Sequence, residues 1–126
     1  MVKTPVFPHL SGHQFICLTT FRKSGEAVPT PVWFAQDGEK VYVMTPAAAG
    51  KVKRIRQNAM VEVTPCTVRG ELLGETAEGM ARVMDDDEEH AAKRALNRKY
   101  GIQKFFYDLY LRLRRTQMVY LEISPM

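Results

Sequence analysis

The sequence predicts a mainly β fold of the α+β class, an antiparallel barrel of six strands with one short helix and a helical pair packed outside it. Three observations predict it. Six short runs are rich in β-branched and aromatic residues, tight turns join the first three, and helical periodicity interrupts the strands only twice. A doubly wound α/β fold is disfavoured because crossover helices do not join the first three strands.

The first three strands should form a meander. They are expected at residues 15–22, 27–36 and 40–45. Ser24-Gly25 and Asp37-Gly38 lie between them, and these residue types tolerate the backbone angles of tight hairpin turns. Two consecutive hairpins therefore open the predicted barrel.

A short helix and two strands come next. Val52, Ile55 and Ala59 recur at i, i+3 and i+7, which predicts a helix over residues 51–59 with one buried face. The following two strands are expected at residues 60–68 and in the stretch that begins at Arg69-Gly70 and runs through 76–84.

A helical pair and a closing strand complete the prediction. The acids of residues 85–89 favour a helix start, and this helix should end near Tyr100, where Gly101 fits a C-cap. A second helix should follow, since apolar residues recur along one stripe. They are Ile102, Phe105, Phe106, Leu109 and Leu113. Alternating residues predict the sixth strand at 117–124.

Composition indicates one soluble domain over residues 1–126, with residues 1–12 as an N-terminal arm that shows no periodicity. No apolar run approaches the roughly 18 residues of a membrane span, and the N-terminus lacks a signal-peptide pattern. We therefore expect a cytoplasmic protein without a membrane span. The excess of 18 Lys and Arg over 14 Asp and Glu favours an anionic partner.

Metal and nucleophilic chemistry are not expected. The acidic run at residues 85–89 lacks the spacing of a calcium-binding loop, and helix capping explains it. The three histidines show no zinc spacing, and Cys17 and Cys66 are expected to be free, buried thiols. No catalytic residue is assigned.

Four cations lie within six residues at the beginning of the predicted short helix. They are Lys51, Lys53, Arg54 and Arg56. The helix dipole disfavours cations at that end unless an anion also lies there, and the unpaired N–H groups of a helix start can bind a phosphate. On these residues alone, a solvated basic face explains the pattern equally well.

Pro29 and Pro31 lie two apart in the second strand, so their missing N–H groups should face the same edge. A barrel opened along this line would expose backbone groups of Thr30, Val32 and Trp33 to the polar edge of a flat heterocycle. Alternatively, the prolines only protect an outer edge against aggregation.

Three short motifs resemble the split barrels related to pyridoxamine phosphate oxidase. The motifs are TPVWF in the second strand, VMT at the end of the third, and Lys51 six residues after Thr45. The resemblance covers about residues 15–123. In that superfamily the helix after the lysine closes with Asn-Pro and completes a phosphate site, whereas this chain has Asn58-Ala59.

The sequence is most similar to the small oxidoreductases of this superfamily that use the deazaflavin coenzyme F-420. TPVWF, the basic helix and Val68-Arg69-Gly70 carry this similarity. It implies a split barrel that forms a homodimer, with two cofactor sites at the interface, each ring over the second strand and each phosphate on Lys51, Lys53 and Arg54. Pyridoxamine phosphate oxidase activity itself is not expected, because the sequence ends at Met126 without the C-terminal substrate-binding segment.

The resemblance implies a set of cofactor-binding residues. They are Thr30, Pro31, Val32, Trp33, Met44, Thr45, Gly50, Lys51, Lys53, Arg54 and Arg69. Coenzyme F-420 is preferred over FMN because its longer anionic tail would use more of the basic surface.

The expected activity is hydride transfer between the reduced cofactor and a small or planar organic acceptor, with Tyr42 and Trp33 shaping the acceptor side. Two alternatives remain. A protein on the same barrel could bind or store FMN or F-420 without turnover, or a barrel could bind nucleic acid through its cations. The second alternative is less well supported, since residues 51–56 contain no aromatic side chain. No nucleic-acid partner is therefore expected.

Overall fold

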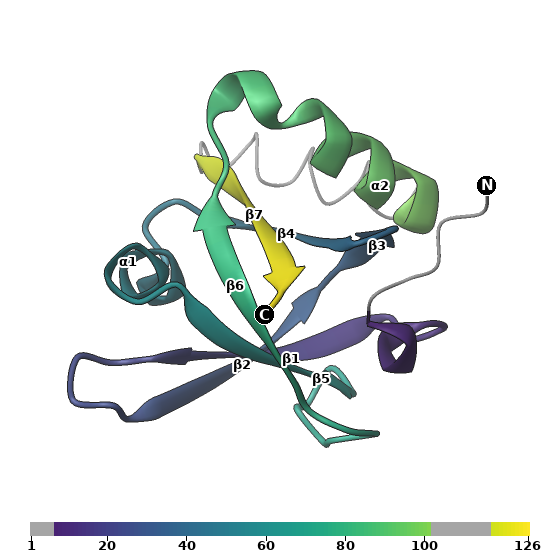
Figure 1. Ribbon diagram of the computed structural model, residues 1–126. Helices are drawn as coiled ribbons and strands as arrows, with labels where there is room; N and C mark the ends of the chain where they lie inside the picture. The colour runs from purple at the N-terminus through teal and green to yellow at the C-terminus, as the bar shows by residue number, and fades with distance from the viewer. Residues whose placement is uncertain (1–6, 102–116) are drawn as a thin grey trace.

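One antiparallel sheet curls around the core of the protein (Figure 1). The computed structural model describes residues 7–101 and 117–126. The strands are β1 (Phe15–Phe21), β2 (Ala27–Trp33), β3 (Ala35–Asp37), β4 (Lys40–Pro46), β5 (Met60–Cys66), β6 (Ala77–Val83) and β7 (Met118–Pro125). Helix α1 spans Gly50–Gln57 and α2 spans His90–Tyr100, and the short 3-10 helices are η1 (Pro8–Leu10) and η2 (Asp86–Glu88).

The strand order in the sheet is β2-β1-β5-β6-β7-β4-β3, and every neighbouring pair is antiparallel. The predicted mainly β, antiparallel architecture is therefore confirmed, with helices at the two predicted positions among the described residues. The predicted second helix, over the stripe from Ile102 to Leu113, lies outside the described residues.

The predicted second strand, residues 27–36, is interrupted at Phe34, so the described residues contain seven strands instead of six. The Phe34 side chain is buried, with 1% of its surface exposed. Its backbone N–H donates a hydrogen bond to the Tyr100 hydroxyl, and its carbonyl lies within hydrogen-bond distance of the same group. A side chain thus binds the backbone groups that a neighbouring strand would otherwise pair.

The predicted three-strand meander is wrong for the same reason. The hairpins β1–β2 and β3–β4 both form, with Phe15 opposite Trp33 and Ala35 opposite Tyr42. However, β2 and β3 lie at opposite ends of the strand order. The chain passes at Phe34 from one edge of the sheet to the other, so the curled sheet brings β2 near β4 without a ladder between them. We call the line along which β2 lies near β4 without pairing the split.

The main core fills the inside of the curled sheet. Alternate residues of the strands supply it, because successive side chains point to opposite faces. Its strand members include Ile16, Leu18, Val41, Val43, Val61, Val63, Ala81, Leu121 and Ile123. Ile55 of α1 closes one part of this core, and Phe7 and Leu10 close another. The described part of the N-terminal arm is therefore integral to the core, with Leu10 fully buried.

Helix α2 covers part of the outer face of the sheet (Figure 1). Ala92, Ala95 and Leu96 recur at helical spacing and pack against Tyr42 of β4 and Tyr120 of β7. No helix among the described residues combines the length and the apolar character that a membrane crossing requires.

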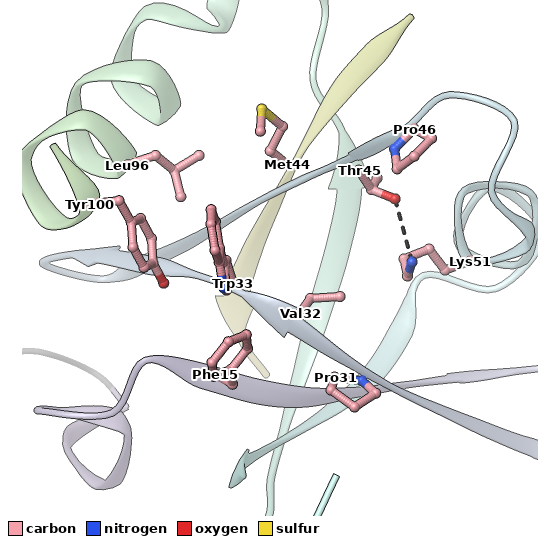
Figure 2. A pocket seen from close by; sticks show the side chains of 10 residues that line it. All are labelled: Phe15, Pro31, Val32, Trp33, Met44, Thr45, Pro46, Lys51, Leu96 and Tyr100. Carbon is pink, nitrogen blue, oxygen red and sulfur yellow. Dashed lines mark hydrogen bonds between the residues drawn. The ribbon is translucent and has the colours of Figure 1, made fainter. Parts of the chain in front are cut away.

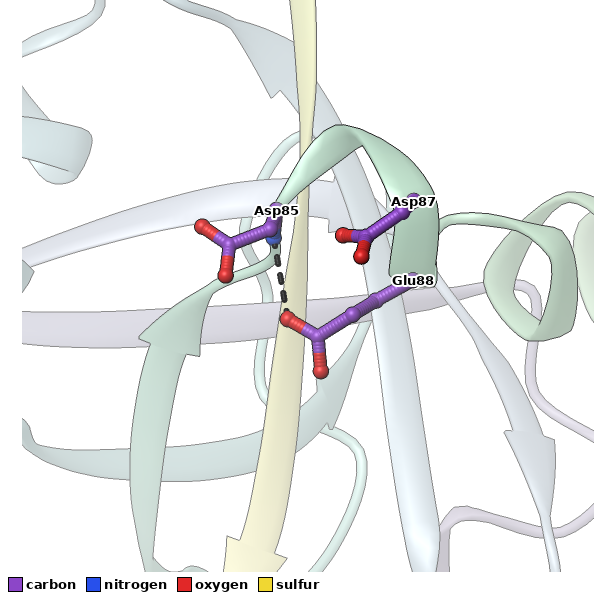
Figure 3. A group of neighbouring side chains, drawn as sticks. All are labelled: Asp85, Asp87 and Glu88. Atoms are coloured by element: carbon purple, nitrogen blue, oxygen red, sulfur yellow. Dashed lines mark hydrogen bonds between the residues drawn. The ribbon is translucent and has the colours of Figure 1, made fainter.

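The acidic run caps the short 3-10 helix η2 directly before α2, so the predicted capping occurs about one turn before the α-helix begins. Asp85, Asp87 and Glu88 lie close together (Figure 3), with carboxylate oxygens within 4.8 Å of one another. The Glu88 carboxylate accepts a hydrogen bond of 3.1 Å from the backbone N–H of Asp85. It also accepts two hydrogen bonds, of 2.9 and 2.8 Å, from the Arg82 guanidinium. Backbone capping and an ion pair therefore account for Glu88.

Glu88→Gln should destabilise the protein near neutral pH. Hydrogen bonds from Arg82 and from the backbone of Asp85 lower the pKa of Glu88 from 4.5 to about 2. The native state therefore holds its proton less tightly than the unfolded chain, so the stabilisation is complete above pH 4.5 and is lost as the pH falls through 2. Urea unfolding of both proteins across this range measures the difference.

Glu75→Gln, in the exposed β5–β6 loop, is the matched control and should show no such pH-dependent difference. A constant difference between wild type and Glu88→Gln at every pH would contradict the assigned role of the ion pair.

Candidate functional site

A pocket of about 300 Å³ lies along the split (Figure 2). Its walls come from β1, β2, β4, α1 and α2, which are distant in the sequence. The lining residues are Phe15, Pro31, Val32, Trp33, Met44, Thr45, Pro46, Lys51, Leu96 and Tyr100. A concave, mostly apolar site with few polar groups is the usual form of a small-molecule binding site.

The prolines of β2 keep one edge of this pocket unpaired. Cys17 lies opposite Pro31, and Thr19 opposite Pro29. A residue without an N–H can occupy only the non-hydrogen-bonded pairs of an antiparallel ladder. The carbonyls of both prolines therefore point away from β1, toward the split. The sequence predicted that the backbone groups of Thr30 and Val32 would be exposed at the open edge. They instead point toward β1.

Lys51 lies at one end of the pocket. Its Nζ is 3.4 Å from the Thr45 hydroxyl, and the Thr45 side chain is buried. Partial burial, together with the nearby Arg54, lowers the pKa of Lys51. Among residues 7–101 and 117–126, Lys51 forms no salt bridge with a carboxylate. A partly buried cation without a counter-ion favours an anionic ligand at this end.

Arg54 lies against the start of α1. Its Nε donates a hydrogen bond of 2.7 Å to the hydroxyl of Thr20, which is fully buried. A Cβ atom at Gly50 would lie only 2.8 Å from the Arg54 Nη1. The absence of a side chain at Gly50 thus leaves room for the guanidinium beside the first turn of the helix, where backbone N–H groups lack intrahelical partners.

The structure brings together most, but not all, of the predicted site residues. Pro31, Val32, Trp33, Met44, Thr45 and Lys51 line the pocket. Gly50 and Arg54 adjoin its basic end, whereas Thr30 does not line it and Lys53 is exposed on α1. Arg69 is exposed in the β5–β6 loop; the adjacent Gly70 lies against Pro31, with 3.5 Å between a Cβ built there and Pro31 Cγ.

Sequence reasoning missed four lining residues, Phe15, Pro46, Leu96 and Tyr100. Tyr100 matters most, since its ring stacks on Trp33 with 5.0 Å between centroids and 17° between planes. The acids before α2 and Gly101 after it predicted the extent of this helix but not the surface that it covers. Tyr42, expected to shape the acceptor side, is instead buried beneath α2, with 5% of its surface exposed.

The pocket has two chemically different ends. In Figure 2, Lys51 and Thr45 lie on one side and Tyr100 and Leu96 on the other, with Trp33 between them. The first end can bind an anionic group through a cation and a hydroxyl. The face of Trp33 away from Tyr100 can accommodate a flat, apolar group. The arrangement therefore suits an elongated ligand with an anion at one end and a ring at the other.

A curled antiparallel sheet with a ligand-sized pocket along its split defines a split-barrel binding protein. The chain belongs to the pyridoxamine 5'-phosphate oxidase family, whose sequence profile matches residues 6–124. The resemblance to the split barrels related to this oxidase is thereby confirmed. The sequence matches no protein of curated function.

Solved structures share the fold at low sequence identity. A haem-storage protein from Vibrio cholerae is 14% identical with a TM-score of 0.67, over 94% of this chain and 85% of that one. An FAD-binding protein from Mesorhizobium loti is 17% identical with a TM-score of 0.64, over 93% and 82%. An F-420 reductase is 20% identical with a TM-score of 0.59, over 94% and 90%. At these identities the likeness establishes the fold alone.

Arg54→Leu should lower the free energy of unfolding by about 1–3 kcal/mol, because it leaves the buried Thr20 hydroxyl without its hydrogen-bond donor. Adding Thr20→Val should recover part of this loss, since the unpaired hydroxyl is then removed. Urea unfolding of the wild type, both single variants and the double variant measures the coupling. Strictly additive losses would contradict the contact.

Proposed function

We propose that the protein is a flavin- or deazaflavin-dependent oxidoreductase that binds coenzyme F-420, or alternatively FMN, along the split. The bound cofactor would supply hydride chemistry toward a small or planar organic acceptor. The observation that carries the proposal is the pairing of a partly buried cation, Lys51, with an aromatic wall, Trp33 and Tyr100, in one pocket.

The basic end fits a phosphate group. Lys51 lies in the first turn of α1, where the helix dipole disfavours a cation unless an anion is also present. Arg54 belongs to the last turn, but its guanidinium reaches back to Gly50. The Arg54 guanidinium occupies the space beside Gly50, so an anion at the start of α1 would meet this cation as well as the unpaired backbone N–H groups. Thr45 would donate from its hydroxyl. These residues would hold the phosphate and so fix the distance between it and the ring.

The wall that Trp33 forms fits the ring of a flavin or deazaflavin. Trp33, Met44 and Leu96 would exclude water from it. The carbonyl of Pro31, which Figure 2 places on the Lys51 side of Trp33, accepts hydrogen bonds only, so the part of a heterocycle that meets it must carry an N–H donor. A ring with an N–H edge and an otherwise apolar body therefore suits this wall.

The choice of F-420 over FMN rests on the remaining cations. Lys53 and Arg56 are exposed on α1, beyond the pocket. A single phosphate does not need them, whereas a longer anionic tail would. The family and the F-420 reductase of the same fold support a cofactor of the flavin type in general.

A homodimer with the cofactor at its interface is part of the proposal. The β5–β6 loop exposes Val68, Leu72 and Leu73, at 65%, 63% and 52% of their surfaces. This apolar loop adjoins Pro31 at the edge of the pocket through Gly70. A second copy that covers it would bury apolar surface and enclose the open side of the pocket, with Arg69 close to the bound ligand.

A non-catalytic binding or storage protein is the second candidate. The observation that favours it is the lack of an acid–base side chain among the pocket-lining residues, apart from Lys51 and the already hydrogen-bonded Tyr100. The haem-storage protein of the same fold is consistent with such a role. In the catalytic case, solvent would supply the proton.

Titration with FMN and with F-420 should give micromolar or tighter binding, followed by cofactor fluorescence. Lys51→Ala should weaken it by about 1.5–3 kcal/mol, the contribution of a hydrogen bond to a charged group. Lys93→Ala removes the same charge from an exposed position on α2 and should leave the affinity unchanged. Failure of the wild type to bind either cofactor would contradict the proposal.

The same preparation tests the nucleic-acid alternative. That alternative requires oligonucleotide affinity that falls steeply with salt concentration. We expect no such dependence, because Trp33 and Tyr100 line the pocket between β2 and α2 and are not interleaved with the exposed cations of α1.

Turnover separates an oxidoreductase from a storage protein. The reduced cofactor bound to the wild type should be oxidised by planar acceptors such as quinones faster than the free cofactor at the same concentration. Stopped-flow absorption at the cofactor band measures both rates. Tight binding with no acceleration by any acceptor in a chemically varied panel would favour the storage function.

A further inference from the structure

Trp33 is the single tryptophan of the chain. Its ring lies between Tyr100 and Lys51 as seen in Figure 2. Tyr100 stacks on one face, and the ring of Phe15 lies 6.3 Å away at a tilt of 52°. The side of the indole away from Tyr100 therefore faces the part of the pocket that leads to the cation.

The Tyr100 ring is anchored by its own hydroxyl. The oxygen accepts a hydrogen bond of 2.9 Å from the Phe34 N–H. The carbonyl oxygens of Gln14 and Phe34 lie 2.8 and 2.5 Å from it, within reach of its single proton. Burial raises the pKa of Tyr100 to about 12, so the hydroxyl keeps that proton in the physiological range. Because Phe34 follows Trp33 directly in the chain, the hydrogen bonds of the Tyr100 hydroxyl lie next to Trp33, on which the Tyr100 ring stacks.

The preceding residue of α2 strengthens this attachment. Lys99 Nζ donates a hydrogen bond of 2.6 Å to the His13 carbonyl and lies 3.4 Å from the centre of the Phe34 ring. Gly101 then ends the helix with a φ of +54°. The last turn of α2 is thus joined to the segment before β1 and to the break between β2 and β3.

We propose that Tyr100 is a positioning residue that holds the Trp33 indole as a flat wall, against which the conjugated ring of the bound ligand stacks. The inference rests on the proposed function and deepens it. It assigns the ring to the space between Trp33 and Lys51, where a flat wall favours planar over saturated groups. Tyr100 acts through Trp33 and not by contact with the ligand.

A double-mutant cycle tests this relation. The proteins are the wild type, Tyr100→Leu, Trp33→Leu and the double variant, each titrated with FMN and F-420 by cofactor fluorescence. Stacking between aromatic rings contributes enough for each single variant to weaken binding about tenfold. The double variant should bind nearly as well as Trp33→Leu alone. Losses that multiply to about a hundredfold would overturn the proposal.

A ligand without a ring provides the specificity control. Inorganic phosphate should compete at the basic end with the same affinity in the wild type and in Tyr100→Leu. An equal loss for phosphate and for FMN would show that the substitution disturbs the whole pocket, and it would overturn the positioning role.

Trp33 fluorescence supplies a readout in the ligand-free protein. Tyr100→Leu should increase quenching of Trp33 by acrylamide, because one face of the indole is uncovered. Tyr42→Leu is the matched control, since Tyr42 is also buried under α2 but does not line the pocket. Tyr100→Phe keeps the ring and should lie between the wild type and Tyr100→Leu. Unchanged quenching in both Tyr100 variants would overturn the proposal.

The two hypotheses fail in different ways. If the wild type binds neither FMN nor F-420, the proposed function fails, and acrylamide quenching alone decides whether Tyr100 positions Trp33. If the wild type binds and Tyr100→Leu binds equally well, only the positioning role fails.

Discussion

The site depends on the hydrogen bonds between the Phe34 backbone and the Tyr100 hydroxyl. A buried peptide group without partners costs about 1–3 kcal/mol, and here a tyrosine hydroxyl from the end of α2 provides the partner in place of a strand. Because no ladder is needed at that residue, β2 and β3 can lie at opposite edges of one sheet although they are adjacent in the chain. The split, and the pocket along it, result from this break.

The basic end of the pocket shows a conflict between local and global preferences. Lys51 occupies a helix start, where the dipole opposes its charge, and it is also partly removed from water. Arg54 is compensated in part by the buried hydroxyl of Thr20. Local rules are most often broken where a protein functions, and Lys51, which forms no salt bridge within residues 7–101 and 117–126, breaks one.

Features that depend on neighbouring residues could be predicted from the sequence. Turn residues such as Asp37-Gly38 form the hairpin they predicted, and the acids around Glu88 cap the short 3-10 helix η2 that precedes α2. The TPVW motif and Lys51 predicted the parts of the pocket that β2 and α1 line, because both belong to motifs of the family. The break at Phe34 could not be predicted, since its partner Tyr100 lies 66 residues away. Because of the same separation in sequence, the contribution of α2 to the pocket could not be predicted. The predicted three-strand meander was wrong because of the same break at Phe34.

Because of Pro29 and Pro31, the entropic cost of shaping the pocket is met during folding and not during ligand binding. A strand edge that lacks alternate donors cannot be closed by a neighbouring strand, so the split stays open whether or not a ligand is present. The walls are then arranged during folding, and binding need not first break a hydrogen-bonded seam. Such preorganisation leaves more of the contact energy available as affinity. Because Pro29 and Pro31 lack amide hydrogens, the pocket is part of the fold before any ligand binds.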